Sequence, residues 1–312
     1  MTFVILLAGL ALLLLSGQFL VRGSVCLANH LKISKLVIGL TVVSFGTSAP
    51  ELVISLEAAA FGHPDISVGN VIGSNISNIG IVLALAVIIS PYFVKTRAIL
   101  NEWIPMMGAT ILLILLLLDF RLSRIEGIML LALLFFFVYW SIRKSRNNIR
   151  NSNVKFPPAR FKLHVAIIIV ILSCLGLVAG ADLLVRGASQ IARMLGLSER
   201  IISVSVIAVG TSLPELATSV MAAARKENDI SISNVIGSNI FNILAILGTT
   251  AAFVPFSVTD PDFLFDMFWM FGVSLLLFLL ILPLKGSVLT RWKGLIMAVV
   301  YFTYIYLVFF VK

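Results

Sequence analysis

The stretch Gly46-Thr47-Ser48-Ala49-Pro50-Glu51-Leu52 returns 164 residues later as Gly210-Thr211-Ser212-Leu213-Pro214-Glu215-Leu216. Each copy lies inside an apolar segment that is long enough to cross a lipid bilayer. A carboxylate, a helix-breaking proline and hydroxyls are costly at that depth because lipid cannot hydrate them. The return of the whole set at a matching place therefore indicates a binding site built by duplication.

The composition is that of a membrane protein. Of the 312 residues, 60% are hydrophobic and 12% are charged, and the mean hydropathy is +1.11. A soluble domain has about half apolar and about a quarter charged residues. At about 20 residues per crossing, the length allows roughly ten helices. The net charge of +9 comes from basic residues that lie mostly in short loops, where they set topology, so we expect no nucleic-acid partner.

The chain divides into two sets of apolar segments. The expected helices cover residues 3–21, 36–60, 67–90, 98–118 and 125–142, followed by 164–185, 200–224, 231–254, 264–284 and 293–311. We therefore expect a first five-helix half at 1–142, a basic cytoplasmic linker at 143–163 and a second five-helix half at 164–312.

The repeat and the loop charges together predict the topology. Residues 20–79 align with residues 184–243 without a gap, and about half of the aligned positions are identical. Five helices is an odd number, so the second half must insert upside down relative to the first. With the linker in the cytoplasm, most Lys and Arg residues fall on the cytoplasmic side and both termini lie outside. The predicted fold is an all-α membrane protein of ten transmembrane helices, arranged as two inverted-topology repeats with broken helices at the midplane.

The repeated motif collects oxygen atoms on one face of a broken helix. Pro50 lacks an N–H, so the carbonyl of Gly46 loses its helical donor. Thr47 and Ser48 precede Glu51 by four and three residues, so their hydroxyls share a helix face with its carboxylate. Ser55 extends that face. The second copy repeats this arrangement around Pro214 and Glu215.

The helix that follows each motif carries a second polar stripe. Asn70, Ser74 and Asn78 recur at a spacing of four, and Asn234, Ser238 and Asn242 match them. Gly73 and Gly237 are expected to let neighbouring helices approach closely. Glu57, Glu102, Asp182 and Asp266 lie nearer to helix ends, and we interpret them as interfacial.

If these segments converge, they form a cavity of hard oxygen ligands with a charge near −2. Such a cavity suits Ca²⁺ and Na⁺, whereas Zn²⁺ and Cu²⁺ favour His or Cys, and Mg²⁺ gives up its water reluctantly.

The two motifs, each with its companion helix, resemble the α-repeats of the cation/calcium exchanger superfamily, and specifically the prokaryotic sodium/calcium exchangers of the inner membrane. The resemblance rests on residues 46–51 with 69–76, and on residues 210–215 with 234–240. It implies that Glu51 and Glu215 bind Ca²⁺ at the centre, with Asn78 and Asn242 completing that position. It also implies that sodium sites are lined by backbone oxygens near Ser44 and Ala208 and by the hydroxyls of Thr47, Ser48, Ser74, Thr211, Ser212 and Ser238. The resemblance further implies that the first and sixth helices slide across the core.

This sequence departs from part of the family at Asn242, where some relatives carry Asp. The site therefore has only two acidic residues. The linker of about 20 residues is also too short for the large calcium-sensing domains of animal exchangers.

The predicted function is secondary active antiport of Ca²⁺ against Na⁺ by alternating access, driven by ion gradients and electrogenic if a third Na⁺ is carried. The nearest alternative is a Ca²⁺/H⁺ antiporter in which Glu51 or Glu215 takes up protons. A dependence on K⁺ is also open. An intramembrane hydrolase and a passive cation channel are remote alternatives.

We expect no cofactor beyond the transported Ca²⁺ and Na⁺, and no enzymatic activity. There is no phosphate-cradling motif, so no nucleotide is expected. The lipid bilayer is the expected surrounding, and a monomer is sufficient for the site. The expected location is the inner membrane of a prokaryote.

Overall fold

The computed structural model describes residues 2–93, 96–151, 156–194, 208–258, 263–282 and 288–310. The described chain is predominantly helical. Seven of its helices are long and apolar enough to cross a membrane, or eight if the bent pair Lys35–Thr47 and Ala49–Ala60 is one span.

The first 151 residues form α1 (Thr2–Leu31), α2 (Lys35–Ile38), the π-helix η1 (Gly39–Val43), α3 (Ser44–Thr47), α4 (Ala49–Ala60), α5 (Pro64–Ser77), the π-helix η2 (Asn78–Leu83), α6 (Ala84–Ile89), α7 (Thr96–Leu116), the 3-10 turn η3 (Leu117–Asp119) and α8 (Arg124–Asn151). The later helices are α9 (Leu163–Met194), α11 (Ala208–Thr211), α12 (Leu213–Ala224), α13 (Asn228–Phe241), the π-helix η5 (Asn242–Leu247), α14 (Gly248–Phe253), α15 (Phe263–Ile281) and α16 (Arg291–Phe310).

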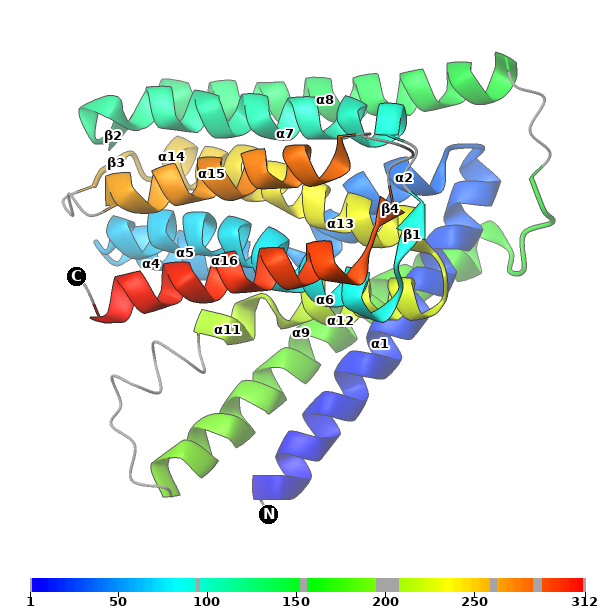
Figure 1. Ribbon diagram of the computed structural model, residues 1–312, viewed down its shortest axis with the longest axis horizontal. Helices are drawn as coiled ribbons and strands as arrows, with labels where there is room; N and C mark the ends of the chain where they lie inside the picture. The colour runs from blue at the N-terminus through cyan, green and yellow to red at the C-terminus, as the bar shows by residue number, and fades with distance from the viewer. Residues whose placement is uncertain are drawn as a thin grey trace.

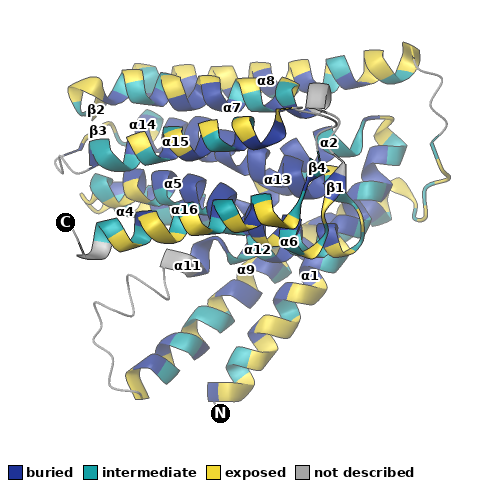
Figure 2. Cartoon of the chain, in the orientation of Figure 1, coloured by how far each residue is buried: buried dark blue, intermediate teal, exposed yellow. Residues whose placement is uncertain are grey.

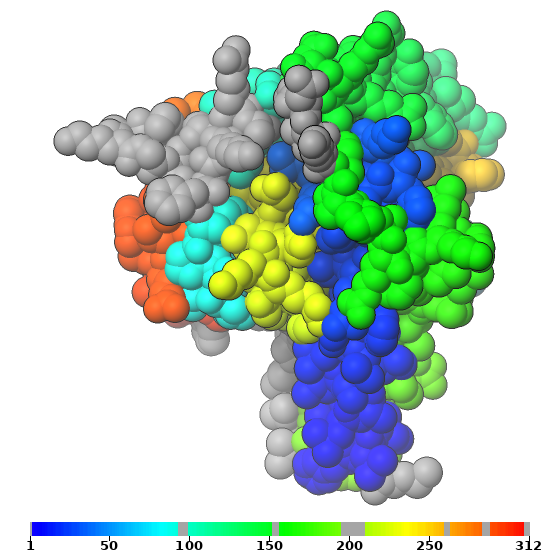
Figure 3. All heavy atoms as spheres, turned by 90° about the vertical axis from the view of Figure 1, so that its right-hand side faces the viewer, coloured from blue at the N-terminus to red at the C-terminus, as the bar shows by residue number. Residues whose placement is uncertain are grey.

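The helices are stacked in layers, with one oblique pair (Figure 1). Helices α7 and α8 form an outer layer, and α1 and α9 lie obliquely on the opposite side of the bundle. The oblique pair packs closely at Gly9 of α1, which has no side chain. A Cβ added there would lie only 3.0 Å from the backbone oxygen of Gly180 of α9. Figure 1 and Figure 3 show the N-terminal part of α1 extending, together with part of α9, beyond the layered bundle.

The distribution of polar and apolar side chains is that of a protein surrounded by lipid. Large apolar side chains are exposed along α1 and α8, including Phe3, Phe135 and Phe136 (Figure 2). Ser, Thr, Asn and Glu side chains are buried at the centre, where α13 and η5 have no exposed face. A surface this apolar is stable only against lipid, so the chain is an integral membrane protein.

Both motif helices are broken as the prolines predict. Helix α3 ends at Thr47 and α4 begins at Ala49, and the axis bends by 47° between them. In the second copy Ser212 separates α11 from α12, with backbone angles close to those of Ser48.

Several helices are longer than expected. The expected ends at residues 21, 142 and 185 were each placed directly before an arginine. In the structure, α1, α8 and α9 continue to Leu31, Asn151 and Met194. Arg and Lys are good helix formers, so a charge alone does not end a helix. Helix α1 stops only where Lys32 adopts the left-handed conformation, with φ of 52°. The expected helix at 200–224 lies partly outside the described residues, which resume at Ala208.

Besides the helices, four two-residue strands pair at the ends of the bundle (Figure 1). Strand β1 (Tyr92–Phe93) pairs antiparallel with β4 (Val288–Leu289) at one end. Strand β2 (Arg121–Leu122) pairs with β3 (Phe256–Ser257) at the other. Each short sheet ties a loop of one sequence half to a loop of the other.

Candidate functional site

Two carboxylates are buried at the centre of the protein. Glu51 lies in the first turn of α4 and Glu215 in the first turn of α12, directly after the two breaks. Each residue is only 1% exposed. They lie close enough to repel each other electrostatically. The positive ends of the two helix dipoles offset part of this buried negative charge, but they supply no full counter-charge.

Hydroxyls of the first motif reach the second copy. Ser48 Oγ donates a hydrogen bond of 3.0 Å to Glu215 Oε1. Thr47 Oγ1 lies 3.4 Å from Asn234 Oδ1 and 3.5 Å from Ser238 Oγ, both on α13. The broken helix of the first motif therefore lines the same space as α12 and α13.

Two asparagines lie where α-helix changes to π-helix. Asn78 begins η2 and Asn242 begins η5, and both are 1% exposed. Each donates its amide nitrogen to another asparagine, at 3.0 Å in both cases. Single-turn π segments inside α-helices are frequent at functional sites.

Four acceptor oxygens in this region have no hydrogen-bond partner among the described residues. They are Glu51 Oε2, Glu215 Oε2, Asn78 Oδ1 and Asn242 Oδ1. Buried polar atoms are normally paired, and a bare buried carboxylate oxygen is especially costly. All four are acceptors, which are the atoms through which a protein binds a cation. No group of three or more His, Cys, Asp or Glu side chains that could hold a metal ion occurs in the described part of the chain.

All ten predicted site residues are buried. Ser48 bonds to Glu215, and Thr47 Oγ1 lies 3.5 Å from Ser238 Oγ, whereas Ser74 and Ser212 make no hydrogen bond to either carboxylate within the described ranges. Gly237 permits the predicted close approach, since an added Cβ would meet Ser44 Oγ and Leu40. At Gly73 no described atom lies within 4 Å of an added Cβ.

The sequence did not reveal the roles of Asn75 and Asn239. They bond to each other across α5 and α13 and also hold the amides of Asn78 and Asn242. Their only signal was the repeated segment Gly-Ser-Asn-Ile, in which Ser and Gly have more obvious roles. The π-helical starts at Asn78 and Asn242 also had no sequence signal.

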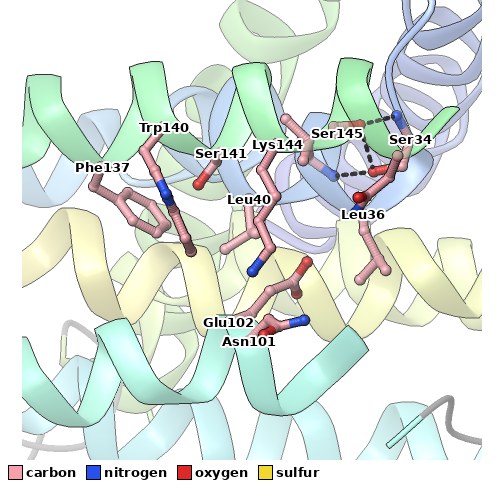
Figure 4. Close-up of a pocket in the computed structure, with 12 residues that line it drawn as sticks. Ser34, Leu36, Leu40, Asn101, Glu102, Phe137, Trp140, Ser141, Lys144 and Ser145 are labelled. Atoms are coloured by element: carbon pink, nitrogen blue, oxygen red, sulfur yellow. Dashed lines mark hydrogen bonds between the residues drawn. The ribbon is translucent and has the colours of Figure 1, made fainter. Parts of the chain in front are cut away.

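A separate cavity of about 100 Å³ lies between α7, α8 and α2 (Figure 4). Glu102 of α7 and Lys144 of α8 point toward each other in it. Glu102 was expected to be interfacial, but it is only 8% exposed and its Oε2 has no hydrogen-bond partner among the described residues. None of the ten predicted site residues lines this cavity.

Comparison with known proteins identifies the family. The family described as "Sodium/calcium exchanger protein" matches residues 1–143 and 165–310. CaxA of Alkalimonas amylolytica, named as a candidate antiporter, is 36% identical over 98% of each chain. The sodium/calcium exchanger MaX1 of Methanosarcina acetivorans is 30% identical over 99% of each. A solved structure of the sodium-calcium exchanger NCX_Mj, soaked with Na⁺ and Ca²⁺, aligns with a TM-score of 0.81 at 34% identity and covers 97% of each chain. The chain therefore belongs to the sodium/calcium exchanger family of membrane antiporters.

Proposed function

We propose that this Ca²⁺ antiporter exchanges Ca²⁺ for Na⁺ by alternating access, with Glu51 and Glu215 as its two charged ligands. The observation that carries the proposal is the set of four unpartnered acceptor oxygens, two from these carboxylates and two from buried asparagines. One Ca²⁺ or two Na⁺ would neutralise the two carboxylates. The ions would then exclude each other by repulsion, which is the requirement for exchange through one cavity.

The other proposed ligands divide by charge and position. Asn78 and Asn242 would present neutral amide oxygens to Ca²⁺ at the centre. The hydroxyls would line the surrounding sodium sites; they belong to residues Thr47, Ser48, Ser74, Thr211, Ser212 and Ser238. A third Na⁺ would give the loaded carrier a net charge and make transport sensitive to voltage.

We also propose the topology that alternating access needs. It consists of ten spans in two inverted five-helix halves, 1–142 and 164–312, with a cytoplasmic linker and both termini outside the cell. Hydrogen bonds related by the 164-residue offset support this arrangement. Asn70 donates to Ser55 at 3.0 Å, and Asn234 donates to Ser219 at 2.9 Å in the same way.

Proton coupling is the alternative that the site itself suggests. The electrostatic repulsion between two buried carboxylates can be relieved by binding a proton as well as by binding a cation. A Ca²⁺/H⁺ antiporter would use the same two glutamates, and K⁺ could enter as a further coupled ion.

Ion flux in proteoliposomes separates these couplings. We would measure uptake of radiolabelled Ca²⁺ into vesicles loaded with Na⁺, with the pH clamped equal on both sides and K⁺ absent. We expect Ca²⁺ uptake to follow the Na⁺ gradient. In a parallel series with K⁺, a membrane potential clamped with valinomycin should change the rate of this uptake. Uptake that ignores Na⁺ but follows an imposed pH gradient would replace Na⁺ coupling with H⁺ coupling.

A further inference from the structure

Two asparagines outside the proposed ligand set form a symmetrical link between α5 and α13. Asn75 Nδ2 donates to the backbone oxygen of Asn239 at 3.3 Å, and Asn239 Nδ2 donates to the backbone oxygen of Asn75 at 3.2 Å. Both residues are 1% exposed, so water cannot substitute for these bonds. The two residues occupy matching positions in the sequence repeat.

The free ends of these two amides hold the proposed ion ligands. Asn75 Oδ1 accepts from Asn242 Nδ2 at 3.0 Å, and Asn239 Oδ1 accepts from Asn78 Nδ2 at 3.0 Å. The nitrogen of each proposed ligand is thereby occupied, and its oxygen is left without a partner. An asparagine binds a cation only through its oxygen, because its NH₂ group carries partial positive charge. The orientation of the amide therefore decides whether the residue attracts or repels an ion.

The holding residues cannot easily turn over themselves. If the Asn75 amide flipped, its oxygen would face the backbone oxygen of Asn239 and its nitrogen would face Asn242 Nδ2. Two acceptors and two donors would then be opposed in a buried space, which is costly. The sulfur of Met270 lies 3.5 Å from Asn75 Nδ2, and that of Met106 lies 3.8 Å from Asn239 Nδ2.

We propose that Asn75 and Asn239 are positioning residues that turn the amide oxygens of Asn242 and Asn78 toward the transported ion. The proposal rests on the proposed function, because it assumes that residues 78 and 242 bind the ion. The positioning is crossed between the two copies. Asn75 on α5 positions Asn242, which follows α13, and Asn239 on α13 positions Asn78, which follows α5. Loading of the site therefore depends on contact between the two copies of the motif, and not on either copy alone.

The crossed pattern gives a test that general loss of packing would not pass. We would measure Ca²⁺ affinity of the purified full chain by radioligand binding. Asn75→Ala should weaken binding about tenfold, as expected for the loss of one buried hydrogen bond to a ligand. In a double-mutant cycle, Asn75→Ala should add nothing to Asn242→Ala, but it should add its full penalty to Asn78→Ala. The reverse pattern, or additive penalties in both cycles, would overturn the proposal.

A rescue experiment tests orientation directly. The side chain introduced by Asn242→Asp presents oxygen whichever way it turns and cannot donate to Asn75 Oδ1, so Asn75→Ala should not weaken binding in that background. A tenfold penalty that persists there would show that Asn75 does not act through the amide of residue 242. Met270→Leu is the matched control, because it removes only the sulfur contact and keeps the Oδ1 bond; it should bind Ca²⁺ like the parent protein.

The design separates failure of this inference from failure of the proposed site. If Asn78→Ala and Asn242→Ala both bind Ca²⁺ normally, the proposed ligand set itself is wrong. If Asn75→Ala does not elute as a monodisperse protein, Asn239→Ala is combined with Asn78→Ala and with Asn242→Ala instead. Its penalty should then vanish in the Asn78→Ala background and persist in the Asn242→Ala background, and the opposite result would overturn the proposal.

Discussion

The close approach at Gly237 yields a sharp prediction for Gly237→Ala. This glycine lies in α13, where the helix crosses η1 and α3. An added Cβ would lie 2.7 Å from the backbone oxygen of Leu40 and 2.8 Å from its Cα, and it would also meet Ser44 Oγ. Backbone atoms of a buried helix cannot rotate away, so α13 and η1 must separate.

The magnitude follows from the contacts that would be disturbed. Overpacking a buried helix contact costs about 1–3 kcal/mol. Ser44 Oγ also lies 2.7 Å from Gly39 O and 2.9 Å from Asn234 O, which share its single hydroxyl hydrogen, and rotating it away would sacrifice about 1 kcal/mol. We therefore expect Gly237→Ala to lower the free energy of unfolding by about 3 kcal/mol. Displacement of α13 would also move Ser238 away from Thr47 and weaken Ca²⁺ binding.

The matched control is Gly73→Ala, at the corresponding position of the first copy. No described atom lies within 4 Å of its added Cβ, and alanine is favoured over glycine in a helix by about 1 kcal/mol. We expect this variant to be neutral or slightly more stable. Unfolding in mixed detergent, followed by tryptophan fluorescence, measures both variants. Equal stability of the two variants would refute the packing argument at Gly237.

Two further predictions concern single contacts, and a third concerns competition between the two ions. Trp103→Phe should lower stability by at least about 1 kcal/mol in the same unfolding assay, because it removes the 2.8 Å bond from Trp103 Nε1 to Ser274 O and part of the ring that stacks on Phe278. It should leave Ca²⁺ affinity unchanged, and a change in that affinity would contradict this. Lys35→Met should lower the free energy of unfolding by less than about 1 kcal/mol, because the 2.6 Å ion pair between Lys35 and Glu227 is partly exposed, and about 0.5 M salt should abolish the difference. A large loss of stability that does not depend on salt would contradict this. Added Na⁺ should compete with radiolabelled Ca²⁺ in equilibrium binding with a Hill coefficient of about two or more, whereas Ca²⁺ binding that is indifferent to Na⁺ would place the ions in separate sites.

The features that the sequence predicted are those in which a residue has few possible structural roles. A proline removes one hydrogen bond from a helix, so Pro50 and Pro214 indicated the two breaks, although Pro105 lies inside α7 without ending it. A carboxylate at membrane depth needs a partner, so the sequence alone singles out Glu51 and Glu215, and both are buried.

The remaining features depend on tertiary contacts that leave little trace in local sequence. An Asn residue can cap a helix, coordinate an ion or bond to another amide, so the role of Asn75 could not be separated from that of Asn78. The π-helical segments at Asn78 and Asn242 add one residue to a turn, and no composition rule marks them. The ends of α1 and α9 were missed because a change from apolar to charged residues marks a solvent boundary and not a helix end.

The central claim is that Glu51 and Glu215 together carry Ca²⁺ through the membrane. The most direct test is Na⁺-driven uptake of radiolabelled Ca²⁺ by Glu51→Gln and Glu215→Gln in proteoliposomes, with equal protein incorporation. Each variant keeps the shape of the side chain but removes one of two charges, and loss of a buried charged ligand costs several kcal/mol. We expect uptake to fall at least a hundredfold in each variant. Uptake at the rate of the parent protein in either variant would contradict the account.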